Sequence, residues 1–209
     1  MNEKITKEID FKYLDNLLLA VESKQFKYFK INEKKADITY LRKPPSLAFD
    51  IFKCGLMGEF RRQKYKIKEQ SNLRKGSKDY LKIFSQNNLI TKIDSFVDEK
   101  IDVVFLALYE GETRYLFPFS SNGGFYPTYK YVTRYKDGMV FEEYMVQSNQ
   151  IVYEKYVKQD ASKTLYFNIN YVPNGKHKVL NYQKGVFEHC SIIGFNLLEQ
   201  RTWMDELNK

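Results

Sequence analysis

Residues 126–147, YPTYKYVTRYKDGMVFEEYMVQ, contain two β-rich runs on either side of a turn signal. Tyrosine, valine and threonine are frequent in both runs, and these residues favour strands because their side chains pack well on a pleated surface. Asp137-Gly138 between the runs is a strong signal for a tight hairpin, since both residue types tolerate positive φ angles. We therefore expect strands near 126–135 and 139–147 that pair antiparallel.

The same pattern extends on both sides of this hairpin. Glu110-Gly111-Glu112 and Pro173-Asn174-Gly175 are turn signals next to further β-rich runs. About seven closely spaced strands with short turns predict an antiparallel sheet that could curve into a half-barrel. A final helix is expected at about 197–208, where Leu198 and Leu207 are apolar. The further strands are expected at 101–109, 113–119, 150–158, 163–172 and 185–195.

The first hundred residues have a different pattern. Apolar residues at three- and four-residue spacing, such as Tyr13, Leu17 and Val21, predict helices. The sequence therefore predicts one α+β domain over 1–209, in which a helical, basic N-terminal half packs with a tyrosine-rich antiparallel sheet and a C-terminal helix. The architecture is expected to change near residue 100. The helices are predicted at 8–22, at about 46–60, from Ser77 to Asn87-Asn88 and over 90–97, with a hairpin from 25–31 and 36–41 and an extended segment at 63–69.

The positive charge is unevenly distributed. The chain has 209 residues and a net charge of +8, with 22 Lys and Arg against 14 Asp and Glu in residues 1–100 and 12 of each in residues 101–209. Two cysteines, no apolar leader and no run of about 18 apolar residues predict a cytoplasmic protein rather than a secreted or membrane one. No ligand spacing indicates a metal or another cofactor.

Residues 61–82 contain most of this excess, with nine basic residues against Glu69 and Asp79. A surface with several cations gains affinity for nucleic acid by releasing the counterions condensed on the phosphates. Phe26, Tyr28 and Phe29 could offer faces for base stacking. A solvated basic face, an acidic protein partner or, less well, an anionic membrane would explain the same charge. The candidate nucleic-acid-binding residues are Arg61, Arg62, Lys64, Lys66, Lys68, Arg74, Lys75, Lys78 and Lys82.

Candidate catalytic groups are few. His177 is expected in a turn, and His189 shares a strand face with apolar residues, which favours a hydrogen-bonded core histidine. Neighbours along a strand point to opposite faces, so His189 is poorly placed to activate Cys190. Another set of residues loosely follows the acid and Glu-x-Lys pattern of metal-dependent nucleases, with arginine in place of lysine. These residues are Asp102, Glu110, Glu112 and Arg114.

Residues 103–121, VVFLALYEGETRYLFPFSS, form an apolar run, a short turn and a second run that ends in Pro-x-Ser-Ser. This segment resembles the strand–turn–strand of type III toxin–antitoxin endoribonucleases, and the resemblance implies that Ser120 or Ser121 lies near a cleaved phosphate. It covers about 19 residues, a plain hairpin predicts the same pattern, and Asn122-Gly123-Gly124 replace a basic residue of that family. We therefore assign no family from it.

The sequence favours a non-enzymatic, nucleic-acid-directed binding protein that contacts RNA or DNA phosphates through the basic first half. A metal-independent endoribonuclease and a protein-interaction or inhibitor module with an acidic partner are the alternatives. Tyrosines such as Tyr129 and Tyr131 lie on the uncharged face of their strand, which favours packing over base stacking. A small basic chain without catalytic motifs is also typical of phage or mobile-element defence or counter-defence factors.

Overall fold

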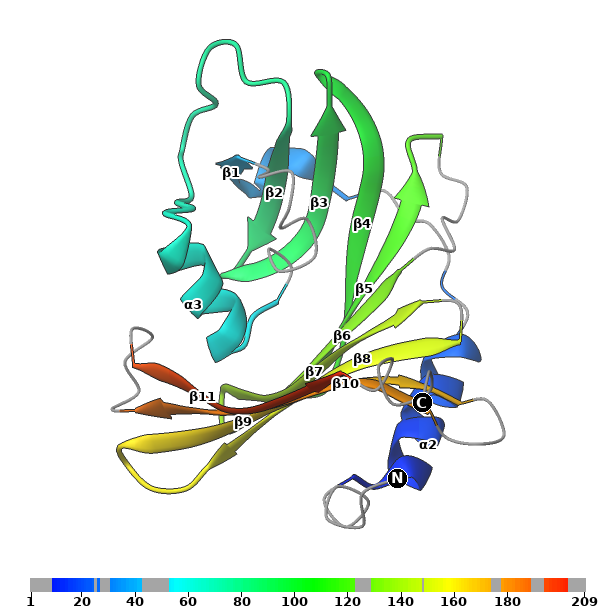
Figure 1. Ribbon diagram of the computed structural model, residues 1–209. Helices are drawn as coiled ribbons and strands as arrows, with labels where there is room; N and C mark the ends of the chain where they lie inside the picture. Colours follow the sequence, from blue (N-terminus) through cyan, green and yellow to red (C-terminus); the bar gives the residue numbers. More distant parts are fainter. Residues whose placement is uncertain are drawn as a thin grey trace.

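The computed structural model describes residues 9–24, 26, 31–42, 53–122, 129–147, 149–173, 178–188 and 194–202. Its strands form one antiparallel sheet of 11 strands, each paired with the next strand along the chain (Figure 1). The helical elements are α2 (Phe11–Glu22), η1 (Glu33–Lys35) and α3 (Leu56–Lys64). The strands are β1 (Asp37–Arg42), β2 (Tyr80–Gln86), β3 (Leu89–Val97), β4 (Lys100–Glu110), β5 (Thr113–Ser120), β6 (Lys130–Lys136), β7 (Met139–Gln147), β8 (Gln150–Lys158), β9 (Lys163–Val172), β10 (Lys178–Glu188) and β11 (Phe195–Thr202).

The prediction of a helical first half and a C-terminal helix is wrong. Residues 80–97, expected to be mostly helical, form the hairpin of β2 and β3. The final helix was expected at 197–208, but residues 195–202 are strand β11, and 203–208 lie outside the described residues. The sheet also continues through residue 100, where β3 pairs with β4, so the expected change of architecture is absent there.

Two tight turns explain why residues 80–110 form strands. Asn87 and Asn88 have φ angles of 52° and 63°, and Asp98 and Glu99 have φ angles of 47° and 64°. Two consecutive residues with positive φ form the turn whose twist matches an antiparallel hairpin. The asparagine pair, expected to break a helix, therefore joins β2 to β3. Glu99 is an unusual residue at such a position, and this is why the β3–β4 turn gave no sequence signal.

The other expected elements have mixed outcomes. The helix expected at 8–22 is present as α2, and the hairpins expected in the second half are present as β4–β5, β6–β7 and β8–β9. β1 pairs with β2 instead of with residues 25–31, most of which lie outside the described residues. α3 extends to Lys64, so the segment expected to be extended from 63 begins helical. Residues 46–52 lie outside the described residues.

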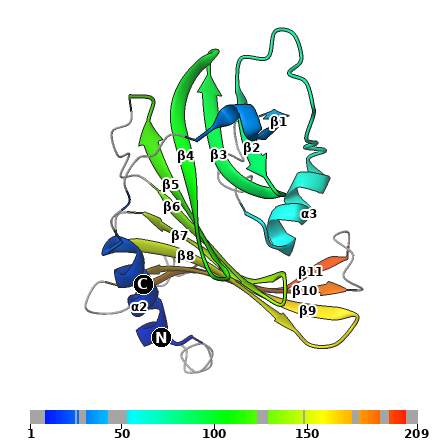
Figure 2. The same ribbon diagram turned by 180° about the vertical axis from the view of Figure 1, so that it is seen from behind.

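The helices α2 and α3 cover opposite faces of the sheet (Figures 1 and 2). α2 buries Leu14, Leu18 and Val21 against Tyr153 and other residues of β6–β10. α3 buries Met57 against Tyr156, Tyr166 and Phe187. Tyr153 and Tyr156 are an odd number of positions apart on β8, so their side chains lie on opposite faces. Figure 1 shows the sheet bent, with α3 on the inside of the bend between β2–β3 and β11.

Candidate nucleic-acid interface

The loop after α3 lies against the outer edge of β1, the first strand of the sheet. Tyr40 and Gln70 exchange two backbone hydrogen bonds of 2.8 and 2.9 Å, which hold the loop on this edge. Farther along, the backbone N–H of Glu99 donates to the carbonyl of Lys78 at 3.0 Å, and that of Asp98 donates to the carboxylate of Asp79 at 3.1 Å. The loop between residues 70 and 79 is therefore fixed at both ends.

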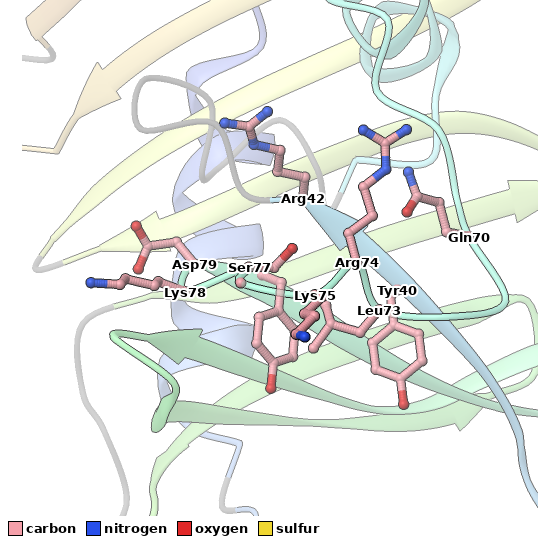
Figure 3. A pocket seen from close by; sticks show the side chains of 11 residues that line it. Tyr40, Arg42, Gln70, Leu73, Arg74, Lys75, Ser77, Lys78 and Asp79 are labelled. Carbon is pink, nitrogen blue, oxygen red and sulfur yellow. The ribbon is translucent and has the colours of Figure 1, made fainter.

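A pocket of about 410 Å³ lies between this loop and the edge of the sheet. The described residues that line it include four cationic side chains, those of Arg42, Arg74, Lys75 and Lys78, and one carboxylate, that of Asp79. All five side chains are exposed. Figure 3 shows Arg42 and Arg74 extending to the same side of the pocket. We call this set of residues the cationic pocket; its side chains carry a net charge of +3.

Aromatic side chains line the same pocket. Tyr40 and Tyr80 are both half-buried in its wall. Arg42 lies opposite Tyr80 in the β1–β2 register, and Tyr80 lies opposite Phe96 in the β2–β3 register. The Tyr80 and Phe96 rings stack with centroids 4.4 Å apart and planes 11° apart. The cations therefore lie beside a row of rings whose positions are set by strand pairing.

The structure separates the nine predicted binding residues. Arg74, Lys75 and Lys78 line the cationic pocket. Arg61 and Arg62 are half-buried on α3, where an Nη of Arg62 donates to the carbonyl of Lys53 at 2.6 Å. The Nζ of Lys82, on β2, lies 4.7 Å from the centre of the Phe84 ring. The exposed side chains of Lys64, Lys66 and Lys68 lie at the end of α3 and just after it, outside the pocket lining.

Sequence reasoning missed Arg42, Tyr40 and Tyr80. Arg42 is 32 positions from Arg74, so only the pairing of β1 with β2 and the bridge to Gln70 bring them together. The aromatic residues proposed for stacking have a different position: Phe26 stacks on Phe117 at 4.6 Å in an apolar cluster. Tyr28 and Phe29 lie outside the described residues.

The other candidate groups are not brought together. Asp102, Glu110 and Glu112 are exposed, whereas Arg114 is only 2% exposed and donates to the Thr133 hydroxyl at 2.9 Å. Ser120 donates to the side chain of Asn122 in the turn after β5. His177, His189 and Cys190 lie outside the described residues. In the part of the chain that the structure describes, no three His, Cys, Asp or Glu side chains are grouped as a metal site requires.

Most of the sheet tyrosines are core residues. Tyr131, Tyr144 and Tyr153 are at most 6% exposed, and Tyr166 and Tyr171 are completely buried. The packing interpretation of these tyrosines agrees with this burial. Within the described residues, neither α-helix is long and apolar enough to cross a membrane.

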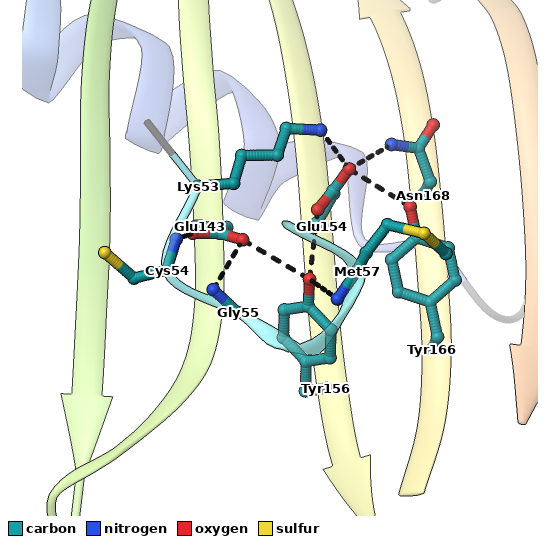
Figure 4. Close-up of polar contacts among 9 residues, drawn as sticks. All are labelled: Lys53, Cys54, Gly55, Met57, Glu143, Glu154, Tyr156, Tyr166 and Asn168. Carbon is teal, nitrogen blue, oxygen red and sulfur yellow. Dashed lines mark hydrogen bonds and ion pairs between the residues drawn. The ribbon is translucent and has the colours of Figure 1, made fainter. Parts of the chain in front are cut away.

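Two buried glutamates hold the segment that leads into α3 (Figure 4). Glu143 on β7 and Glu154 on β8 lie directly opposite each other and are 3% and 1% exposed. Glu143 accepts hydrogen bonds from the backbone N–H groups of Cys54 and Gly55 at 2.9 and 3.0 Å. Glu154 pairs with Lys53. The segment 53–55 is therefore attached to the sheet by its backbone and by one ion pair.

Tyrosine hydroxyls complete this carboxylate cluster. The Tyr156 hydroxyl lies 3.3 Å from Glu143 and 3.1 Å from Glu154, and Tyr166 donates to Glu154 at 3.0 Å. A Cβ atom on Gly55 would lie 2.4 Å from the Tyr156 ring, so the close approach of the segment requires glycine. Because the chain covers both carboxylates, we interpret the cluster as the anchor of α3, not as a reaction centre.

The cluster predicts a pH dependence of stability. Burial, followed by the neighbouring Glu154 charge, raises the pKa of Glu143 from 4.5 to about 7. A raised pKa in the folded state means that folding takes up a proton. The contribution of protonated Glu143 to the free energy of unfolding is therefore complete at acidic pH and is lost as the pH rises through about 7. We expect the free energy of unfolding to fall by about 2 kcal/mol between about pH 5 and about pH 8.

Urea unfolding of the protein and of Glu143→Gln across this pH range measures this dependence. Glutamine does not titrate, so the decline should be smaller in the variant by the contribution of Glu143. An equal decline in both proteins would show that Glu143 is not responsible.

The fold and the site define a class of protein: an antiparallel meander with a cationic pocket at one edge of its sheet. No protein-family model matches the chain, and no curated protein or solved structure matches it.

Proposed function

We propose that the protein binds nucleic acid and contacts its phosphates through the cationic pocket. The observation that supports this most directly is the group of Arg42, Arg74, Lys75 and Lys78 around one pocket, with Asp79 as the only carboxylate in its described lining. Arginine guanidinium groups match phosphate geometry with two parallel hydrogen bonds, and lysines add mobile point charges. All four cations are exposed, so a phosphate can reach them from solvent.

The proposal favours binding over catalysis. Asp79, the carboxylate in the described pocket lining, accepts a hydrogen bond from the backbone N–H of Asp98. The buried Glu143 accepts one from the backbone N–H of Cys54, in the segment before α3. We propose a cytoplasmic location, because the chain has only two cysteines, whereas a secreted, loop-rich domain would usually carry more. A role as a defence or counter-defence factor of a phage or mobile element fits this proposal but is not required by it.

The salt dependence of binding tests the proposed function. Four phosphate contacts release counterions, so the logarithm of the affinity for single-stranded oligonucleotides should fall with the logarithm of the salt concentration with a slope of about −3. Fluorescence anisotropy with labelled RNA and DNA over a series of salt concentrations gives this slope. No binding at low salt, or binding that salt does not weaken, would contradict the proposal.

Two controls distinguish the alternatives. An acidic protein partner would remain in a pull-down after nuclease treatment, whereas a complex through nucleic acid would be lost. A metal-independent endoribonuclease would degrade RNA in the presence of EDTA, whereas a binding protein leaves the RNA intact.

A further inference from the structure

We propose that the cationic pocket accepts an unpaired base, so that the protein binds single-stranded nucleic acid in preference to a duplex. This inference rests on the proposed function and specifies its ligand. It requires an aromatic or apolar surface for the base, space for it, and cations within reach of the adjoining phosphates.

The aromatic surface is supplied by Tyr40 and Tyr80. Phe96 stacks on one face of the Tyr80 ring and holds it in place. Tyr40 is tilted by 58° to Tyr80 with the ring centroids 6.2 Å apart, so it is not stacked on the second face. Both tyrosines line the pocket. A ring that is held in place and lines a pocket is the arrangement by which proteins stack bases without sequence preference.

Space and a third apolar contact come from the loop. The volume of about 410 Å³ is within the range of pockets that hold a small ligand. Leu73 lines the pocket and is 38% exposed, an unusual position for leucine in a loop whose other side chains are polar or charged. An apolar side chain on this wall suits the face or edge of a base better than it suits a phosphate.

The cations are placed for the phosphates on either side of such a base. Arg42 extends from the end of β1, whereas Arg74, Lys75 and Lys78 extend from the loop. A base inside a duplex can enter a pocket only after it is unstacked and unpaired, which costs free energy. A single strand avoids this cost, and so the pocket should select single strands.

The test compares affinities for oligonucleotides of about 12 nucleotides, as single strands and as blunt duplexes of the same sequence, at one salt concentration. The variants are Tyr40→Leu and Tyr80→Leu. The matched control is Tyr65→Leu, because Tyr65 is 52% exposed in the same basic segment but does not line the pocket. Thermal unfolding of each variant verifies that it is folded.

We expect the protein to bind the single strand at least about tenfold more tightly than the duplex. Each pocket variant should lose about tenfold in single-strand affinity, with its salt dependence unchanged, whereas Tyr65→Leu should bind like the unmodified protein. Equal affinity for the single strand and the duplex would overturn this inference. Folded Tyr40→Leu and Tyr80→Leu variants that bind normally would overturn it too. Either result would leave the proposed phosphate binding standing. Absence of binding to any oligonucleotide would instead overturn the proposed function.

Discussion

Replacing Glu154 with leucine is expected to lower the free energy of unfolding by about 3–5 kcal/mol, because the change breaks an ion pair whose carboxylate is buried. Glu154 is 1% exposed and pairs with Lys53. It also accepts hydrogen bonds from Tyr166 and Asn168 at 3.0 and 2.9 Å. Leucine would leave the Tyr166 hydroxyl and the Asn168 amide without this acceptor and would remove the carboxylate that pairs with Lys53. Urea unfolding measures the loss.

Two further variants separate this effect from a general failure to fold. Tyr166→Phe removes one donor to Glu154 and is expected to cost about 1 kcal/mol. Glu112→Gln changes an exposed glutamate at the β4–β5 turn and should stay within about 0.5 kcal/mol of the unmodified protein. If Glu154→Leu lowers the free energy of unfolding by less than about 1 kcal/mol, Glu154 does not anchor the segment before α3.

The second large effect concerns binding. Changing Arg74, Lys75 and Lys78 together to glutamine removes three of the four cations of the pocket. Counterion release then predicts a loss of about 100-fold in affinity for single-stranded nucleic acid at about 0.1 M salt. All three side chains are exposed, so stability should change little. Anisotropy titration and thermal unfolding measure the two quantities.

A matched control removes the same charge elsewhere. Lys12, Lys136 and Lys163 are exposed on α2, at the β6–β7 turn and at the start of β9, and none lines the cationic pocket. Their joint replacement by glutamine should reduce the affinity by much less than the pocket triple. Equal losses would mean that net charge, and not the pocket, determines binding.

Local sequence signals predicted β1 and β4–β9 but failed for β2, β3 and β11. In β6–β9, turns such as Asp137-Gly138 and dense β-formers agree with each other. In β2 the spacing of Tyr80, Ile83 and Phe84 resembles a helix, but a register shift lies directly after Phe84. Ile83 and Phe84 are both buried, at 5% and 0% exposure. A strand covered on both faces has no clear alternation, so its pattern cannot be separated from that of a helix.

The candidate site could be predicted from the sequence only in part. The charge count located Arg74, Lys75 and Lys78, because they are neighbours in sequence. Arg42 and Tyr80 join them through a strand pairing between residues far apart in the chain, which no local pattern encodes. Arg62 illustrates the opposite case: the charge count included it, but its guanidinium contacts the backbone of Lys53.

The most direct test of the central claim is the salt slope of single-strand binding in the two triple variants. If the cationic pocket makes the phosphate contacts, the slope should change from about −3 to about −1 in the variant of Arg74, Lys75 and Lys78. It should remain near −3 in the variant of Lys12, Lys136 and Lys163. Identical slopes in the two variants would contradict the claim that this pocket binds nucleic acid.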